Sequence, residues 1–142
     1  MSNIKYLRKQ YGKQTTTNFH LEKMAKQLGI RNFHVLMRDE LCQLKNKNNV
    51  NFITNLHTSD QYGVHWSAGH RTKNGDNYYF DSYGLPPTNE VKELLGNGIH
   101  NTFQIQKPGT TYCGQLCLYV LYKLQKGVAF LDIMLELNKE IA

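Results

Sequence analysis

The stretch CGQLCLYVLYKLQ, at residues 113–125, decides the fold that we predict for this chain. It follows a loop that contains Pro108 and Gly109, and it stops before Gly127, so it has the boundary signals of a single helix. Its apolar side chains lie nearly all round the helix, and a helix of that kind is buried on most sides. We therefore expect a central helix with a sheet on one side and other helices on another.

The rest of the chain predicts a mixture of strands and helices. Apolar alternation or aromatic enrichment predicts strands, apolar residues at helical spacing predict helices, and signals such as Asn74-Gly75 predict turns. Residues 30–49 are expected to be irregular, with a short apolar piece at Phe33–Met37. The predicted strands are 50–57, 64–70, 77–83 and 102–106, and the predicted helices are one capped by Asn18 and Gly29, then 89–95, 113–125 and 128–140.

Length and composition predict one domain with a short arm before it. A chain of 142 residues can bury a hydrophobic core without disulfide bonds, and its three cysteines, an odd number, argue against a disulfide framework. No apolar run approaches the roughly 18 residues of a membrane span, and the N-terminus lacks the apolar stretch of a secretory signal. We expect an intracellular protein without membrane contact, divided into an arm (1–17) and a domain (18–142).

The charge of the chain indicates a further kind of partner. The formal net charge is +6, and the arm carries Lys5, Arg8, Lys9 and Lys13 without an acidic residue among them. Such a balance serves ordinary solubility, or it attracts nucleic acid or an acidic protein. DNA bound through the basic arm is therefore a candidate partner, although no recognised nucleic-acid motif accompanies it.

Four side chains supply the parts of an acyl-transfer site with a cysteine nucleophile. Cys113 begins the buried helix, where unpaired N–H groups and the helix dipole stabilise a thiolate. His65 is the candidate base, and Asp81 is the candidate carboxylate that orients its ring. The amide of Gln106, with the backbone N–H of Cys113, is the candidate donor to the developing oxyanion.

Each candidate has an ordinary structural alternative. Taken alone, Cys113 fits a buried structural thiol, and Cys117, one helical turn later, is best interpreted as a core residue. Asp81 is unusual in an aromatic strand by propensity, but an edge position or a turn would also explain it. The side chain of His65 alternates with that of Trp66, so it should leave the face that buries the tryptophan.

The spacing of His65 and Asp81 constrains the hairpin between them. Direct opposition of the two would centre the hairpin near Lys73, whereas a tight turn on Asn74-Gly75 would centre it between those two residues. We therefore expect a connection longer than two residues, or a bulge in one strand.

The ordered set resembles the adenovirus-type maturation proteases, the adenains, whose clan also holds the SUMO-specific proteases. The resemblance rests on GVHW at 63–66, YFDSYG at 79–84, and a glutamine at 106 followed by CG at 113–114, and it covers residues 18–142. The ending Phe-Asp-Ser-Tyr-Gly is more like the versions found in virophages and virus-like transposons. Asp81 stands where adenain has Glu, although Asp is usual elsewhere in the clan.

The resemblance implies an α+β, papain-like rearranged cysteine protease fold, with a mixed sheet of about four or five strands packed on the nucleophile helix. It implies an endopeptidase that cleaves viral capsid or structural precursors, after small residues such as Gly-Gly, as a monomer at the virus assembly site and in the virion. No metal or cofactor is expected. The implied site consists of the catalytic residues His65, Asp81, Gln106 and Cys113 and the substrate-binding residues Trp66 and Gly114.

Two other functions remain open at this stage. The same site would serve an isopeptidase for a ubiquitin-like modifier, because those tails also end in Gly-Gly. The basic arm would suit a non-catalytic capsid component that binds nucleic acid.

Overall fold

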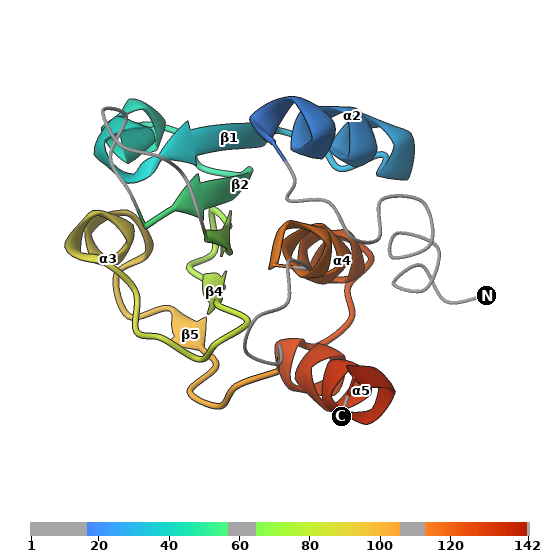
Figure 1. Ribbon diagram of the computed structural model, residues 1–142. Helices are drawn as coiled ribbons and strands as arrows, with labels where there is room; N and C mark the ends of the chain where they lie inside the picture. Colours follow the sequence, from blue (N-terminus) through green and yellow to red (C-terminus); the bar gives the residue numbers. More distant parts are fainter. Residues whose placement is uncertain (1–16, 57–64, 106–112, 142) are drawn as a thin grey trace.

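A mixed sheet lies between two helical layers in the computed structural model, which describes residues 17–56, 65–105 and 113–141 (Figure 1). The outer pairs β1–β2 and β4–β5 are parallel, and the inner pairs β2–β3 and β3–β4 are antiparallel. The α+β class and the mixed sheet predicted from the sequence are confirmed. In spatial order the five strands are β1 (Phe33–Met37), β2 (Val50–Asn55), β3 (Trp66–Arg71), β4 (Tyr78–Phe80) and β5 (Ile99–His100).

The helices divide between the two faces of the sheet. One face carries α2 (Asn18–Leu28), α4 (Cys113–Gln125) and α5 (Phe130–Ile141), and Figure 1 shows α4 between the other two. The other face carries the 3-10 helix η1 (Arg38–Leu44) and α3 (Asn89–Leu95). The predicted central helix is thus α4, with the bounds expected from its sequence.

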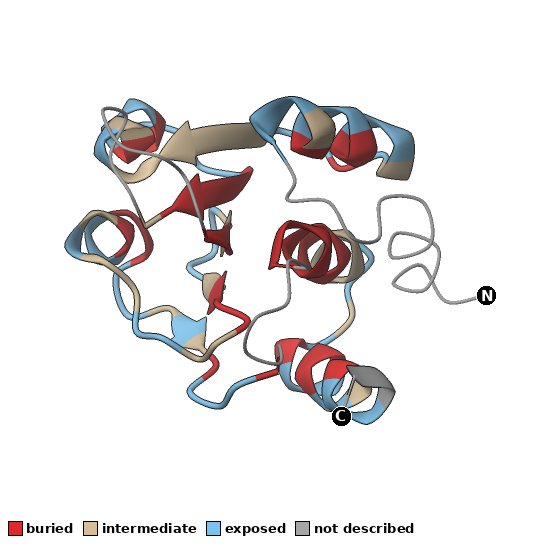
Figure 2. Cartoon of the chain, viewed as in Figure 1, coloured by how far each residue is buried: buried red, intermediate tan, exposed pale blue. Residues whose placement is uncertain are grey.

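Burial of α4 fixes where its N-terminus lies. Every residue from Cys113 to Leu121 is buried, and Figure 2 shows α4 and the middle strands as the buried centre, with the outer faces of α2 and α5 exposed. Each fully buried large apolar side chain contributes about 1.5–3 kcal/mol, so the helix is held firmly against the sheet. The core on this face includes Leu21, Met24, Ile53, Ala68, Phe80, Leu116, Leu121, Ile133 and Leu137.

The prediction that residues 30–49 are irregular is wrong. They contain strand β1 and the helix η1. All five residues of β1 are half-buried, so this strand lacks the alternation by which a strand is found in a sequence. Its order comes from parallel pairing with β2, a partner that no local pattern indicates.

The predicted strand at 102–106 is also wrong for its described part, residues 102–105, and the strand lies earlier, at Ile99–His100. The reason is the next residue, Asn101. Its side-chain amide, rather than its backbone, bonds to the N–H and the carbonyl of Asp81. The ladder between β4 and β5 therefore ends at His100.

Several predicted boundaries shift by a few residues. Thr17, not Asn18, caps the first helix, since its hydroxyl accepts the N–H of His20. Strand β4 covers only Tyr78–Phe80 of the predicted 77–83, and the last helix begins at Phe130. In the described ranges, no helix combines the length and the apolar character needed to cross a membrane.

The hairpin connection agrees with the expectation that it exceeds two residues. Strand β3 ends at Arg71 and β4 begins at Tyr78. The pairing of Ala68 with Phe80 centres the hairpin on Asn74, so His65 and Asp81 are diagonal rather than direct neighbours.

Gly69 packs tightly against Phe52 on the face of the sheet that carries η1 and α3. Phe52, its partner on β2, lays its ring over the glycine, and a Cβ at position 69 would overlap three atoms of that ring. We expect Gly69→Ala to lower the free energy of unfolding by about 1–3 kcal/mol, as overpacking does. Urea denaturation measures the loss.

Gly69→Ala combined with Phe52→Leu should recover part of that loss, because the smaller side chain makes room for the methyl group. A double variant less stable than Gly69→Ala by the full cost of Phe52→Leu would contradict this account, because the two effects would then be independent.

Candidate active site

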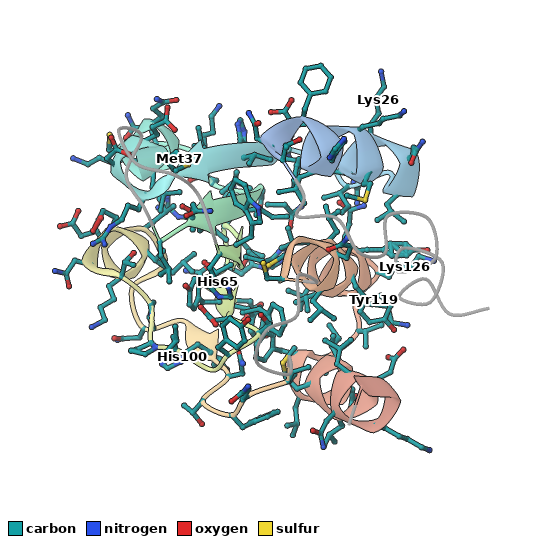
Figure 3. The ribbon with its side chains drawn as sticks, viewed as in Figure 1. Lys26, Met37, His65, His100, Tyr119 and Lys126 are labelled. Atoms are coloured by element: carbon teal, nitrogen blue, oxygen red, sulfur yellow. The ribbon has the colours of Figure 1, made fainter. Side chains whose placement is uncertain are left out.

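His65 and Asp81 form a buried pair at one end of the β3–β4 hairpin. Nε2 of His65 lies 3.1 Å from each carboxylate oxygen of Asp81, and the two residues are 6% and 0% exposed. His65 directly precedes β3 and Asp81 directly follows β4, so antiparallel pairing brings them to the same end. Figure 3 shows His65 near the centre of the molecule, between the ribbons of the sheet and α4.

The orientation of Asp81 is fixed from both its side chain and its backbone. Its Oδ1 accepts the backbone N–H of Tyr83 at 2.8 Å, in addition to the contact with His65. The amide of Asn101, a buried residue, accepts the N–H of Asp81 at 3.1 Å and donates to its carbonyl at 2.6 Å. Asp81 therefore serves a turn and faces His65 at the same time, so the two sequence interpretations of it are compatible.

The backbone of Trp66 joins the sheet to α4. Its N–H donates to Sγ of Cys113 at 3.5 Å, and Sγ of Cys117 donates to its carbonyl at 3.5 Å. The two sulfur atoms, one helical turn apart, thus hold the N–H and the carbonyl of one residue of β3. Because His65 precedes Trp66 in the chain, this contact also sets Cys113 beside His65.

The electrostatics of His65 favour its charged form. Burial lowers the pKa of His65, but hydrogen bonds to Asp81 and Cys113, together with the negative charges of both groups, outweigh it and raise this pKa to about 9. Since Nε2 faces Asp81, Nδ1 is the ring nitrogen left for Cys113. At neutral pH the arrangement therefore favours the imidazolium form of His65, which lies between Asp81 and Cys113.

Sequence reasoning missed Tyr83 and Asn101 as parts of this site. The ring of Tyr83 stacks on the imidazole of His65, with centroids 4.7 Å apart and an interplanar angle of 24°. Burial, with the nearby Cys113 and Asp81, raises the pKa of Tyr83. A neutral phenol on the ring face stabilises a charged imidazole. Its position two residues after Asp81 was the available signal, whereas nothing in the sequence marks Asn101.

Of the other predicted site residues, Trp66 and Gly114 are buried close to Cys113. Gln106 lies outside the described residues. The side chain of Trp66 is buried in the core on the α4 face, and its hydrogen bond to Cys113 comes from the backbone N–H. Gly114 is buried in the first turn of α4. Substrate binding by Trp66 and Gly114 stays a prediction.

The three cysteines of the chain differ in exposure. Cys42 is exposed, Cys113 and Cys117 are buried, and all three are free thiols. Within the described ranges, no group of three or more His, Cys, Asp or Glu residues could hold a metal ion. Burial raises the pKa of Cys117 well above its ordinary value, so this thiol is neutral and can donate its S–H to the carbonyl of Trp66.

Comparison with known proteins adds no assignment to this geometry. No protein-family model matches the chain, and no curated protein matches it.

The pairing of His65 predicts its titration. Asp81→Asn removes the carboxylate charge beside the ring, so we expect the pKa of His65 to fall from about 9 by about 1 to 3 pH units. Nuclear magnetic resonance of the His65 ring protons measures it. The exposed control Asp76→Asn should leave it unchanged, and equal values in all three proteins would contradict the pairing.

The same pairing predicts how stability depends on pH. An unfolded histidine titrates near 6.5, below the folded value of about 9. The pairing therefore stabilises the fold fully below about pH 6.5, and its contribution is lost as pH rises through 9. Urea denaturation at several pH values should show the loss in the native chain and less of it in Asp81→Asn.

Asn101 predicts a stability cost. Asn101→Ala leaves the buried N–H of Asp81 without its acceptor, so we expect the free energy of unfolding to fall by about 1–3 kcal/mol. Asn97→Ala, an exposed asparagine in the preceding loop, is the matched control and should change stability little. Equal effects of the two substitutions would show that Asn101 does not hold Asp81.

Proposed function

We propose that this chain is a cysteine endopeptidase with Cys113 as nucleophile and His65 and Asp81 as its partners. The observation that carries the proposal is the buried His65 ring, which meets Asp81 through Nε2 and lies beside Cys113, whose sulfur accepts the N–H of the next residue, Trp66. Support comes also from the helix N-terminus at which Cys113 lies, a position that favours a thiolate. The proposed fold is the papain-like rearranged protease fold, in which a buried helix presents the nucleophile to a sheet.

The proposed reaction begins with attack of the Cys113 thiolate on the carbonyl carbon of the scissile peptide. The developing oxyanion is stabilised by the backbone N–H of Cys113 and the amide of Gln106, as the sequence suggests. The imidazolium of His65 gives its proton to the leaving amine as the C–N bond breaks, which leaves a thioester. Neutral His65 then takes a proton from water, which hydrolyses the thioester and restores the thiolate.

Asp81, Asn101 and Tyr83 have positioning roles in this proposal. Asp81 keeps the ring of His65 charged and oriented before the attack. Asn101 holds the backbone of Asp81, and Tyr83 covers one face of the imidazole. Among the described residues, no hydrogen bond joins Asp81, Asn101 or Tyr83 to Sγ of Cys113.

The proposed substrates are viral capsid or structural precursors, cleaved after small residues such as Gly-Gly. This part rests on the resemblance of the sequence motifs to adenains, and with it go the proposed monomeric state and action at the virus assembly site and in the virion. DNA bound through the basic arm stays a proposed partner. Residues 1–16 of that arm lie outside the described residues.

Covalent labelling tests the proposal. A peptide vinyl sulfone ending in Gly-Gly should modify Cys113, located by mass spectrometry, and Cys113→Ala should lower kcat/KM on a capsid precursor by about 10³-fold or more. Cys42→Ala removes an exposed thiol and is the matched control, with activity unchanged.

Persistent cleavage by pure Cys113→Ala would exclude the mechanism. If labelling succeeds but the precursor stays intact, release of a fluorophore from ubiquitin or SUMO conjugates would assign the same site to an isopeptidase. Labelling confined to Cys42 would leave no catalytic role for Cys113.

A further inference from the structure

A polar cavity of about 370 Å³ lies at the end of the sheet opposite the candidate active site. It is formed by the turn between α2 and β1, the start of β2, the end of β3 and the end of α4. Both β3 and α4 begin at the candidate active site and end at this cavity. The 13-residue helix separates the two places by about 18 Å.

The charged residues that line this cavity are all basic. Arg31 and Arg71 line it from two sides, and no aspartate or glutamate is among its described lining residues. His70 lies in the same lining, and burial lowers its pKa, so it is neutral at pH 7 and the positive charge comes from the arginines. The nearest acidic residue along the chain is Asp76, in the exposed turn after β3.

The backbone of Arg31 is held on both sides by side-chain amides. Its N–H donates to Oε1 of Gln125 at 2.7 Å, and its carbonyl accepts Nδ2 of Asn51 at 2.8 Å. The side chain of Arg31 is exposed, and its guanidinium has no hydrogen bond or ion pair among the described residues. Two amides thus fix the position of an arginine whose five N–H donors are left for another molecule.

Arg71 is held through its guanidinium instead. Its Nη1 donates to the carbonyls of Leu44 and Lys45, at 3.3 and 3.1 Å, at the end of η1. No described acceptor takes its other N–H groups. Because one nitrogen is anchored, the rest of the planar fork loses little entropy when it binds an anion.

We propose that this cavity binds the phosphate of a nucleotide, presented by a nucleic-acid strand or by a free nucleotide. Arginine forks match phosphate oxygens in two parallel hydrogen bonds, and the cavity is larger than one phosphate, so a sugar or base has room beside it. The net charge of +6 attracts such a ligand. The site is independent of the proposed peptidase activity, and either can fail alone.

One feature of the fold acts against an anion here. The C-terminus of α4 carries the negative end of the helix dipole. Its last carbonyls already accept N–H groups of Lys126, Gly127 and Val128, which reduces that effect. Two arginine charges exceed what remains of the half charge of a helix end.

Binding of a fluorescent single-stranded DNA to the full chain tests the proposal, with adenosine monophosphate and inorganic phosphate as competitors. Arg31→Gln should weaken binding about tenfold, as loss of a hydrogen bond to a charged group does. It should also lower the slope of the logarithm of the binding constant against the logarithm of the salt concentration by about one. Lys92→Gln is the matched control, because it removes the same charge from an exposed position on α3, across the sheet, and should change affinity less than about twofold.

Arg71→Gln should weaken binding as well, and circular dichroism shows whether this variant is folded.

Competition by the mononucleotide identifies a free nucleotide as a sufficient ligand, whereas binding of the strand alone identifies nucleic acid, and both support the proposal. Absence of binding to either, or equal affinities of Arg31→Gln and Lys92→Gln, overturns it. Peptidase activity of Arg31→Gln should equal that of the native chain.

Discussion

The contact of the Trp66 backbone with the sulfur atoms of Cys113 and Cys117 is the one on which the candidate active site depends. It attaches the first turns of α4 to the start of β3. Apolar burial holds α4 against the sheet, but the hydrophobic effect itself has no direction. The two hydrogen bonds to the Trp66 backbone are directional and define the register of α4, which sets the sulfur of Cys113 beside the imidazole of His65.

Burial lowers the pKa of His65, whereas nearby negative charge and hydrogen bonding raise it, and the second effect is the larger. Desolvation alone would make His65 neutral, as it does for His70 at the far end of the same strand. The two histidines differ in their partners: His70 meets the neutral amide of Asn51, whereas His65 meets the carboxylate of Asp81. A charged ring therefore lies just before β3, and a neutral ring lies near its end.

The sequence predicted the parts of the fold whose signal is local. Helix α4 was predicted with its full bounds because its composition demands burial on most sides. The predicted strands 64–70 and 77–83 overlap β3 and β4, so the sequence already brought His65 and Asp81 to the same end of a hairpin. Strand β1 was missed because its order comes from a parallel neighbour, and 102–106 was misassigned because the side chain of Asn101 ends the ladder. Asn101 and Tyr83 act through contacts that exist only after folding; the position of Tyr83 two residues after Asp81 was a local signal, whereas no sequence pattern marks Asn101.

Alkylation rates at pH 6 test the central claim most directly, since they require no substrate. An ordinary thiol is almost fully protonated at this pH, so exposure alone would make Cys42 the faster thiol with iodoacetamide. The account predicts that buried Cys113 reacts faster than Cys42 and that His65→Ala abolishes this excess. A faster Cys42, with the rate of Cys113 unchanged by His65→Ala, would contradict it.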